Sequence, residues 1–179
     1  MKLLKRGFLF LALISLSSGF AFGANANISH DVDINVLEAV LIGLNDSGAI
    51  SLNTVAPGTP GADPTGEFDA SKELRYTSLA PSTNTRQIHA SYGLTAPPSG
   101  TLLHLEASSV PANCGTAFVG GRTLTGTDQD IITSIGSCAT TTTDGATLTY
   151  TLVIDDVTQL NVGDSATVNV TLTITDATF

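Results

Sequence analysis

The sequence predicts an all-β protein, an antiparallel β-sandwich. Three observations indicate this fold. Short stretches of alternating apolar and polar residues recur along the chain, turn-forming Gly and Pro separate them, and no helical stretch is long enough for a βαβ unit. The chain has 179 residues, with 17 Gly and 7 Pro, and this length suits one domain with a core of its own.

The first 26 residues have the pattern of a secretory signal peptide. Residues 1–6 carry the basic charges, residues 7–14 form an uninterrupted apolar run, and Ala24 and Ala26 fit the small-x-small rule for cleavage. The mature protein is therefore expected to begin at Asn27 and to be exported. Because the apolar run is short for a bilayer span, no membrane span is expected in the mature form.

The charge balance argues against nucleic acid as a partner. Three of the seven Lys and Arg lie in the first six positions, so four remain against sixteen Asp and Glu, a formal net charge of −12 beyond the N-terminus. Phosphate backbones attract basic surfaces and repel acidic ones. The sequence thus predicts no nucleic-acid function.

Two cysteines remain in an exported chain, Cys114 and Cys138. An even number of cysteines in an oxidising compartment is typical of a disulfide. A metal site would need more ligands than these two, and a redox pair would normally be Cys-x-x-Cys. We expect one disulfide between them.

Seven strands are predicted in the body of the chain, residues 45–179. They are residues 48–55, 73–79, 87–92, 103–107, 131–135, 147–154 and 167–175. A short turn is expected between the second and third, and a crossover with one helical turn between the last two. Seven strands in about 130 residues indicate an immunoglobulin-like antiparallel β-sandwich. The last two strands alternate most clearly, which places six side chains in the core: Leu148, Tyr150, Leu152, Val168, Val170 and Leu172.

The segment before this body, residues 27–44, is predicted as one extended strand. Four of its apolar residues share one face: Ile28, Val32, Ile34 and Val36. Seventeen extended residues could span up to roughly 55 Å, more than an ordinary strand of a sandwich. The expected organisation is therefore a signal peptide (1–26), an N-terminal extended strand (27–44) and a β-sandwich domain (45–179).

The apolar face of this N-terminal strand has to be buried somewhere, because an exposed hydrophobic edge invites aggregation. One alternative is that it pairs within its own domain. The other is that it completes the sheet of a neighbouring copy, which gives head-to-tail association and a fibre. Both alternatives remain open from the sequence alone.

The layout resembles the donor-strand-exchange pilins of the chaperone-usher type. The features that carry the resemblance are the signal peptide, the alternating N-terminal stretch, the immunoglobulin-like body with one disulfide, and the chain's end on an alternating strand. The resemblance implies a head-to-tail homopolymer in which Ile28, Val32, Ile34 and Val36 are donor-strand residues. It also implies a periplasmic chaperone and an outer-membrane usher as assembly partners. The mid-body cysteines and the absence of a penultimate Tyr differ from that family.

Catalytic and metal motifs are not found in the sequence. The three histidines are His30, His89 and His104, and neither His-Glu-x-x-His nor Gly-x-Ser-x-Gly occurs. His89 and His104 with Glu106 form the one weak metal candidate among them, against surface histidines as the simpler interpretation. Acidic clusters in the second half of the chain follow no EF-hand spacing. We expect no enzyme activity, no cofactor and no metal site.

The sequence therefore predicts a structural subunit of a secreted surface fibre or pilus, exported through the periplasm to the cell surface. It would polymerise with itself by donating its N-terminal strand. The alternative is a self-contained adhesin or carbohydrate-binding β-sandwich. Sugar-binding platforms rely on exposed aromatic rings, and this chain has three Tyr and no Trp.

Overall fold

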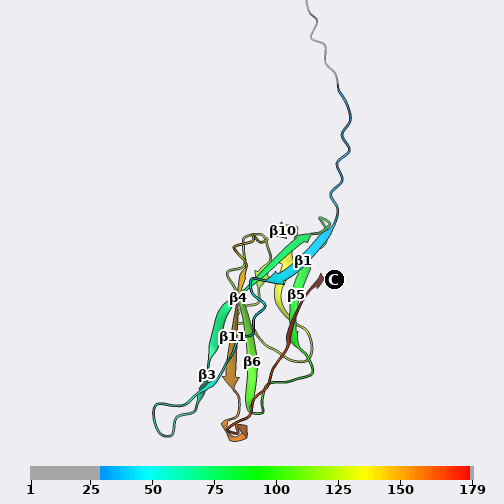
Figure 1. The fold of residues 1–179 in the computed structure, drawn as a ribbon. Helices are drawn as coiled ribbons and strands as arrows, with labels where there is room; N and C mark the ends of the chain where they lie inside the picture. The colour runs from blue at the N-terminus through cyan, green and yellow to red at the C-terminus, as the bar shows by residue number, and fades with distance from the viewer. Residues whose placement is uncertain (1–28, 178–179) are drawn as a thin grey trace, which may run out of the picture. The chain divides into compact units, whose positions relative to one another are not determined.

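The computed structural model describes residues 29–177 and shows an all-β fold built from antiparallel pairs (Figure 1). The predicted signal peptide, residues 1–26, and the predicted donor residue Ile28 lie outside the described residues. The chain divides into two units, Met1–Asn35 and Val36–Phe179, and every strand found in residues 29–177 lies in the second. The prediction of an antiparallel β-sandwich is confirmed.

The larger sheet has the strand order β1-β4-β11-β6-β8, and the short β10 also pairs with β4. Its strands are β1 (Ala39–Leu44), β4 (Phe68–Leu79), β6 (Thr101–Ser108), β8 (Arg122–Thr123), β10 (Cys138–Ala139) and β11 (Ala146–Ile154). Successive side chains of a strand point to opposite faces, so Leu74 and Tyr76 of β4 are buried while Arg75 and Thr77 between them are half-buried on the outer face. One face of this sheet therefore forms half of the core.

The smaller sheet has the order β12-β5-β9-β7. Its strands are β5 (Arg86–Tyr92), β7 (Thr116–Ala117), β9 (Gln129–Ile135) and β12 (Val170–Asp176). Two further short strands, β2 (Thr54–Val55) and β3 (Thr65–Gly66), pair with each other. The helical turn expected between the last two strands is present as η1 (Val157–Gln159), whose first turn is capped by the Asp156 carboxylate accepting from Thr158 N.

The core lies between the two sheets. Its fully buried large side chains come from β4, β5, β6, β9 and β11 and from the residue after β8, and they are Leu74, Ile88, Leu105, Leu124, Ile131, Ile132, Ile135 and Leu148. Burial of such a side chain contributes about 1.5–3 kcal/mol. The sandwich therefore gains its stability chiefly from central strands and less from edge strands such as β1 and β12.

Six of the seven predicted strands are confirmed, as β4, β5, β6, β9, β11 and β12. The prediction for residues 48–55 was mostly wrong, because only Thr54–Val55 is a strand; Ile50 and Leu52 pack against the core without joining a sheet. The alternation of this stretch reflects the burial of two side chains and not hydrogen-bonded pairing of its backbone with another strand. β4 and β5, expected to be joined by a short turn, follow each other closely but lie in different sheets.

The predicted core residues also need a correction. Leu148 and Tyr150 are buried, whereas Leu152 is half-buried. The three predicted core residues of the last strand region, Val168, Val170 and Leu172, are half-buried too and pack against the edge of the core. Among the described strands, β12 has one neighbour, β5, and this leaves part of its inner face in water.

The two ends of the sandwich differ. At one end, β4 finishes at Leu79, β5 begins at Arg86, β12 finishes at Asp176 and β1 begins at Ala39. We call this the root end, because the chain enters the sandwich there from its N-terminal segment. The opposite end, the loop end, holds the loops that precede β6 and β12, which are joined by hydrogen bonds such as Asp155 N to Gly100 O at 2.9 Å.

Candidate assembly interface

The predicted donor residues that the structure describes are exposed. The exposed fractions are 67% for Val32, 85% for Ile34 and 78% for Val36, and Leu37 is 72% exposed. Residues 29–38 are not part of a strand, because a strand exists only when its N–H and C=O groups pair with another strand. Of the strand predicted over residues 27–44, the described residues contain only β1, Ala39–Leu44. β1 belongs to the larger sheet, although the sandwich domain was predicted to begin at residue 45.

Two strand edges lie on one side of the sandwich, which we call the open side. Within residues 29–177, β1 pairs with β4 alone and β12 pairs with β5 alone. The two strands belong to different sheets and lie close to each other on this side. Edge strands present unpaired N–H and C=O groups that can template a further strand.

The open side is apolar. Residues directly opposite in an antiparallel pair share a face, and the partners of the β1 and β12 side chains include the buried Tyr76, Ser78, Ile88 and Ala90. The inward side chains of the two edge strands are Val40, Ile42, Leu44, Val170, Leu172 and Ile174. All six are half-buried or exposed. An added strand could therefore bury apolar surface that the described chain leaves in water.

A buried arginine closes the root end of the open side. Arg86 of β5 is 4% exposed, and its guanidinium binds two carboxylates, Glu38 and Asp176, the latter at 3.1 Å. Glu38 directly precedes β1, and Asp176 is the last residue of β12 and stands opposite Arg86 in the ladder. The guanidinium also donates to three uncharged oxygens: Ala39 O at 3.1 Å, Ser78 Oγ at 3.1 Å and Leu79 O at 3.3 Å.

We call these three residues, Glu38, Arg86 and Asp176, the clasp. Through them both edge strands are held to one guanidinium, and the point where the N-terminal segment joins the sandwich has a defined position. The clasp was not among the features predicted from the sequence. A signal for it exists, because Arg86 shares the inward face of its strand with Ile88 and Ala90, and a charge on an inward face needs a partner.

A second buried cation holds the other end of β1. Lys72 of β4 is 6% exposed, and its ammonium donates to Asp46 Oδ2 at 2.7 Å. That hydrogen bond, together with the Gly48 N–H and the Lys72 charge, lowers the pKa of Asp46 below its ordinary value. At each end of β1, therefore, an acidic residue of the adjoining chain binds a buried cation of the sandwich: Glu38 binds Arg86 and Asp46 binds Lys72.

The predicted disulfide between Cys114 and Cys138 is confirmed, with the two Cα atoms 5.4 Å apart. It joins the turn before β7 in the smaller sheet to β10 in the larger one. The hydroxyl of Tyr76 donates to Cys114 O at 2.5 Å, and burial raises the pKa of Tyr76 to about 12. The disulfide thus ties the two sheets together beside the core.

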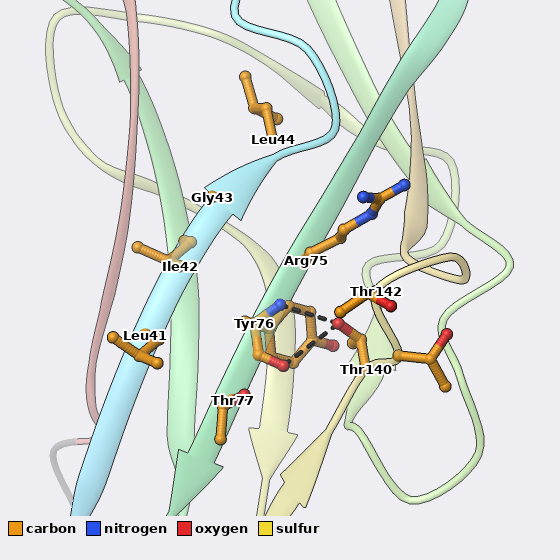
Figure 2. Close-up of a pocket in the computed structure, with 10 residues that line it drawn as sticks. Leu41, Ile42, Gly43, Leu44, Arg75, Tyr76, Thr77, Thr140 and Thr142 are labelled. Atoms are coloured by element: carbon orange, nitrogen blue, oxygen red, sulfur yellow. Dashed lines mark hydrogen bonds between the residues drawn. The ribbon is translucent and has the colours of Figure 1, made fainter.

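A hollow of about 290 Å³ lies between β1 and the loop after β10. Figure 2 shows Leu41 to Leu44 on one side of it, Thr140 and Thr142 on the other, and β4 residues between them. The Thr140 hydroxyl accepts from Tyr76 N at 2.9 Å and donates to Tyr76 O at 3.2 Å, which anchors the loop to β4. The polar groups in this pair satisfy each other and are not presented to a ligand.

The structure separates His89 from His104. His89 lies on β5 in the smaller sheet, with Nδ1 2.7 Å from Asp130 Oδ1, whereas His104 lies on β6 in the larger sheet, with Nε2 3.0 Å from Gly120 O. Across residues 29–177 no group of three or more His, Cys, Asp or Glu is placed to hold a metal ion. The weak metal candidate with Glu106 is therefore not assembled.

Comparison with protein-family models, curated proteins and solved structures finds no match to this chain. In the part of the chain that the structure describes, no helix has the length and apolar character needed to cross a membrane.

Proposed function

We propose that this protein is the structural subunit of an exported fibre, in which each copy donates its N-terminal segment to the open side of the next. One observation carries the proposal. The same chain combines an exposed alternating apolar segment with an apolar open side bordered by two free strand edges. A donor and an acceptor on one molecule, used between copies, give a head-to-tail interface that repeats without closing.

The donor and the acceptor edge match in length. Residues 29–36 would span roughly 26 Å as a strand, and the seven residues of β12 span roughly 23 Å. The apolar residues also match in period, because Val32, Ile34 and Val36 recur every second residue, as do the inward residues of β12. A donor strand can therefore face the core along the whole of β12.

An antiparallel arrangement against β12 fits this pattern best. Every strand pair of the described chain is antiparallel, and antiparallel pairing is slightly more stable per residue than parallel pairing. In the central register, the opposite pairs are Val32 with Ile174, Ile34 with Leu172, and Val36 with Val170. Each donor side chain that becomes fully buried would contribute about 1.5–3 kcal/mol.

The proposal is tested by deleting the donor. Electron microscopy of the full-length mature protein should show fibres. Deletion of residues 27–36 should leave a folded body that no longer polymerises, because residues 29–36, the part of this segment that the structure describes, belong to no strand. A peptide of residues 27–36 should then bind this body and should cap the growth of fibres formed by the full-length protein.

A matched peptide pair makes this test specific. Ile34→Asp places a charge in the acceptor's core and should abolish capping, whereas Asn35→Asp changes the opposite face and should leave it nearly unchanged. Persistent monomers of the full-length protein, with no peptide bound by the body, would contradict the fibre and favour a self-contained adhesin.

A further inference from the structure

The start of β1, held at the root end by its pairing with β4 and by the clasp, limits the direction that the chain's own donor segment can take along β12. β12 runs from the loop end to the root end, where it finishes at Asp176. Glu38, the residue from which the N-terminal segment extends, is held at the same root end by Arg86. A chain's own segment could therefore lie along its own β12 only by turning back at the root end, and it would then run parallel to β12.

The residues at that point are poorly suited to such a reversal. Tight hairpin turns use Gly, Asn or Asp at positions with positive φ, and here the chain has Val36, Leu37 and Glu38. Glu38 is engaged by the guanidinium, and the next carbonyl, Ala39 O, accepts from the same group at 3.1 Å. The turn would have to form from bulky residues next to a fixed strand start.

We infer that the clasp helps to reserve the open side for the segment of a second copy, because it holds Glu38, where the donor segment begins, at the end of β12 from which that segment cannot run antiparallel to β12. This inference rests on the proposed fibre function and adds a reason why a copy does not cap itself. A segment from another copy has no such constraint. It can enter antiparallel to β12, with its Glu38 near the acceptor's loop end.

A linker insertion tests the inference in the full-length mature chain. About 14 Gly and Ser residues inserted between Leu37 and Glu38 would span roughly 20 Å as a flexible coil, enough for the segment to reach the loop end of its own sandwich. A short flexible tether gives an effective concentration in the millimolar range. At about 10 µM protein, self-insertion should then be favoured by about 100-fold, and the variant should be a monomer.

The matched control carries the same linker between Gly58 and Thr59, an exposed site in the loop between β2 and β3. It should polymerise like the unmodified protein. If the variant with the linker after Leu37 also polymerises to the same extent, the inference is wrong, while peptide capping of the truncated body would still support the fibre. If the unmodified protein is a monomer with residues 29–36 protected from hydrogen exchange, or binds no donor peptide, the fibre and the inference both fail.

Engineered cysteines provide a second measurement. Both natural cysteines are in the disulfide, so a chain carrying Asp33→Cys and Thr173→Cys reports only the new pair, which lies opposite in the central antiparallel register. Oxidation should give a ladder of covalent oligomers, and the same substitutions in the variant with the linker after Leu37 should give a cross-link within one chain. A cross-link within one chain of the unmodified length would contradict the inference. Asp33→Cys with Val119→Cys, an exposed site in the turn between β7 and β8, is the control and should not cross-link.

Discussion

At the scale of single residues, the buried Arg86 has an unusual arrangement of partners. Its guanidinium is almost fully buried, whereas the side chains of Glu38 and Asp176 are 55% and 68% exposed. Removing the partners of a buried charge is more costly than removing the charge itself, because the buried ion is left without compensation. Loss of the two carboxylates should therefore lower the stability of the protein more than loss of the Arg86 charge.

This asymmetry can be measured by urea unfolding. The double variant Glu38→Gln with Asp176→Asn should lose about 3–5 kcal/mol of unfolding free energy, because the Arg86 charge stays buried without a carboxylate. Arg86→Met should lose less, since the two carboxylates can be hydrated. Glu73→Gln, which removes the partner of the one-third exposed Arg75, is the control and should change stability by less than about 1 kcal/mol. Equal losses in the double variant and Arg86→Met would show that the charge is not the dominant factor.

At the scale of elements, β12 is an edge strand whose inner face is half covered in the single chain. Leu148 in the centre of the larger sheet is fully buried, whereas Leu172 of β12 is half-buried and packs against the core from one side. Under the proposed function, the donor strand covers the remaining surface of Leu172. Leu148 should then contribute mainly to folding of the single chain, and Leu172 mainly to assembly.

Alanine substitutions should separate these contributions. Leu148→Ala should cost about 2–5 kcal/mol of unfolding free energy, as expected for a fully buried leucine. Leu172→Ala should cost the monomer less, about 1–2 kcal/mol, but should weaken binding of the peptide of residues 27–36. The neighbouring Thr171→Ala, on the exposed face of β12, should have little effect on either measurement. A loss at Leu172 as large as that at Leu148 would mean that the inner face of β12 is already covered in the monomer.

At the scale of the whole molecule, the dominant property is negative charge. Beyond the N-terminus the chain carries four basic and sixteen acidic residues, and two of the four basic ones, Lys72 and Arg86, are buried against carboxylates. Identical copies of such a molecule repel each other at long range. The proposed contact between copies must therefore be apolar and short-range.

Fibre growth should accordingly be faster at higher ionic strength. Raising salt from about 0.01 M to about 0.1 M shortens the Debye length from about 30 Å to about 10 Å, which screens the repulsion between copies and leaves apolar burial in place. Light scattering would measure the growth rate. As a control, a donor peptide with Asp31→Asn and Asp33→Asn should bind the truncated body with a weaker salt dependence than the native peptide. Growth that slows with salt would indicate an attractive ionic interface.

The sequence by itself determined the fold class, six of the seven body strands and the pairing of Cys114 with Cys138. These features follow from local alternation and from the small number of cysteines, so no long-range information is needed. The alternation of residues 48–55 misled for the same reason, because Ile50 and Leu52 bury their side chains without a partner strand. A local pattern reports which side chains are buried and does not report which backbone groups are paired.

Only the tertiary structure decided which strands lie at the edges and what meets at the root end. β1 and β12 are more than 120 residues apart in sequence, yet both border the open side. The clasp forms because β5 places Arg86 at the point where Glu38, before the first strand of the larger sheet, and Asp176, at the end of β12, come together. The order of the strands in each sheet and the partners of a buried charge depend on contacts between distant segments. The pattern of hydrophobic residues along the sequence does not contain this information.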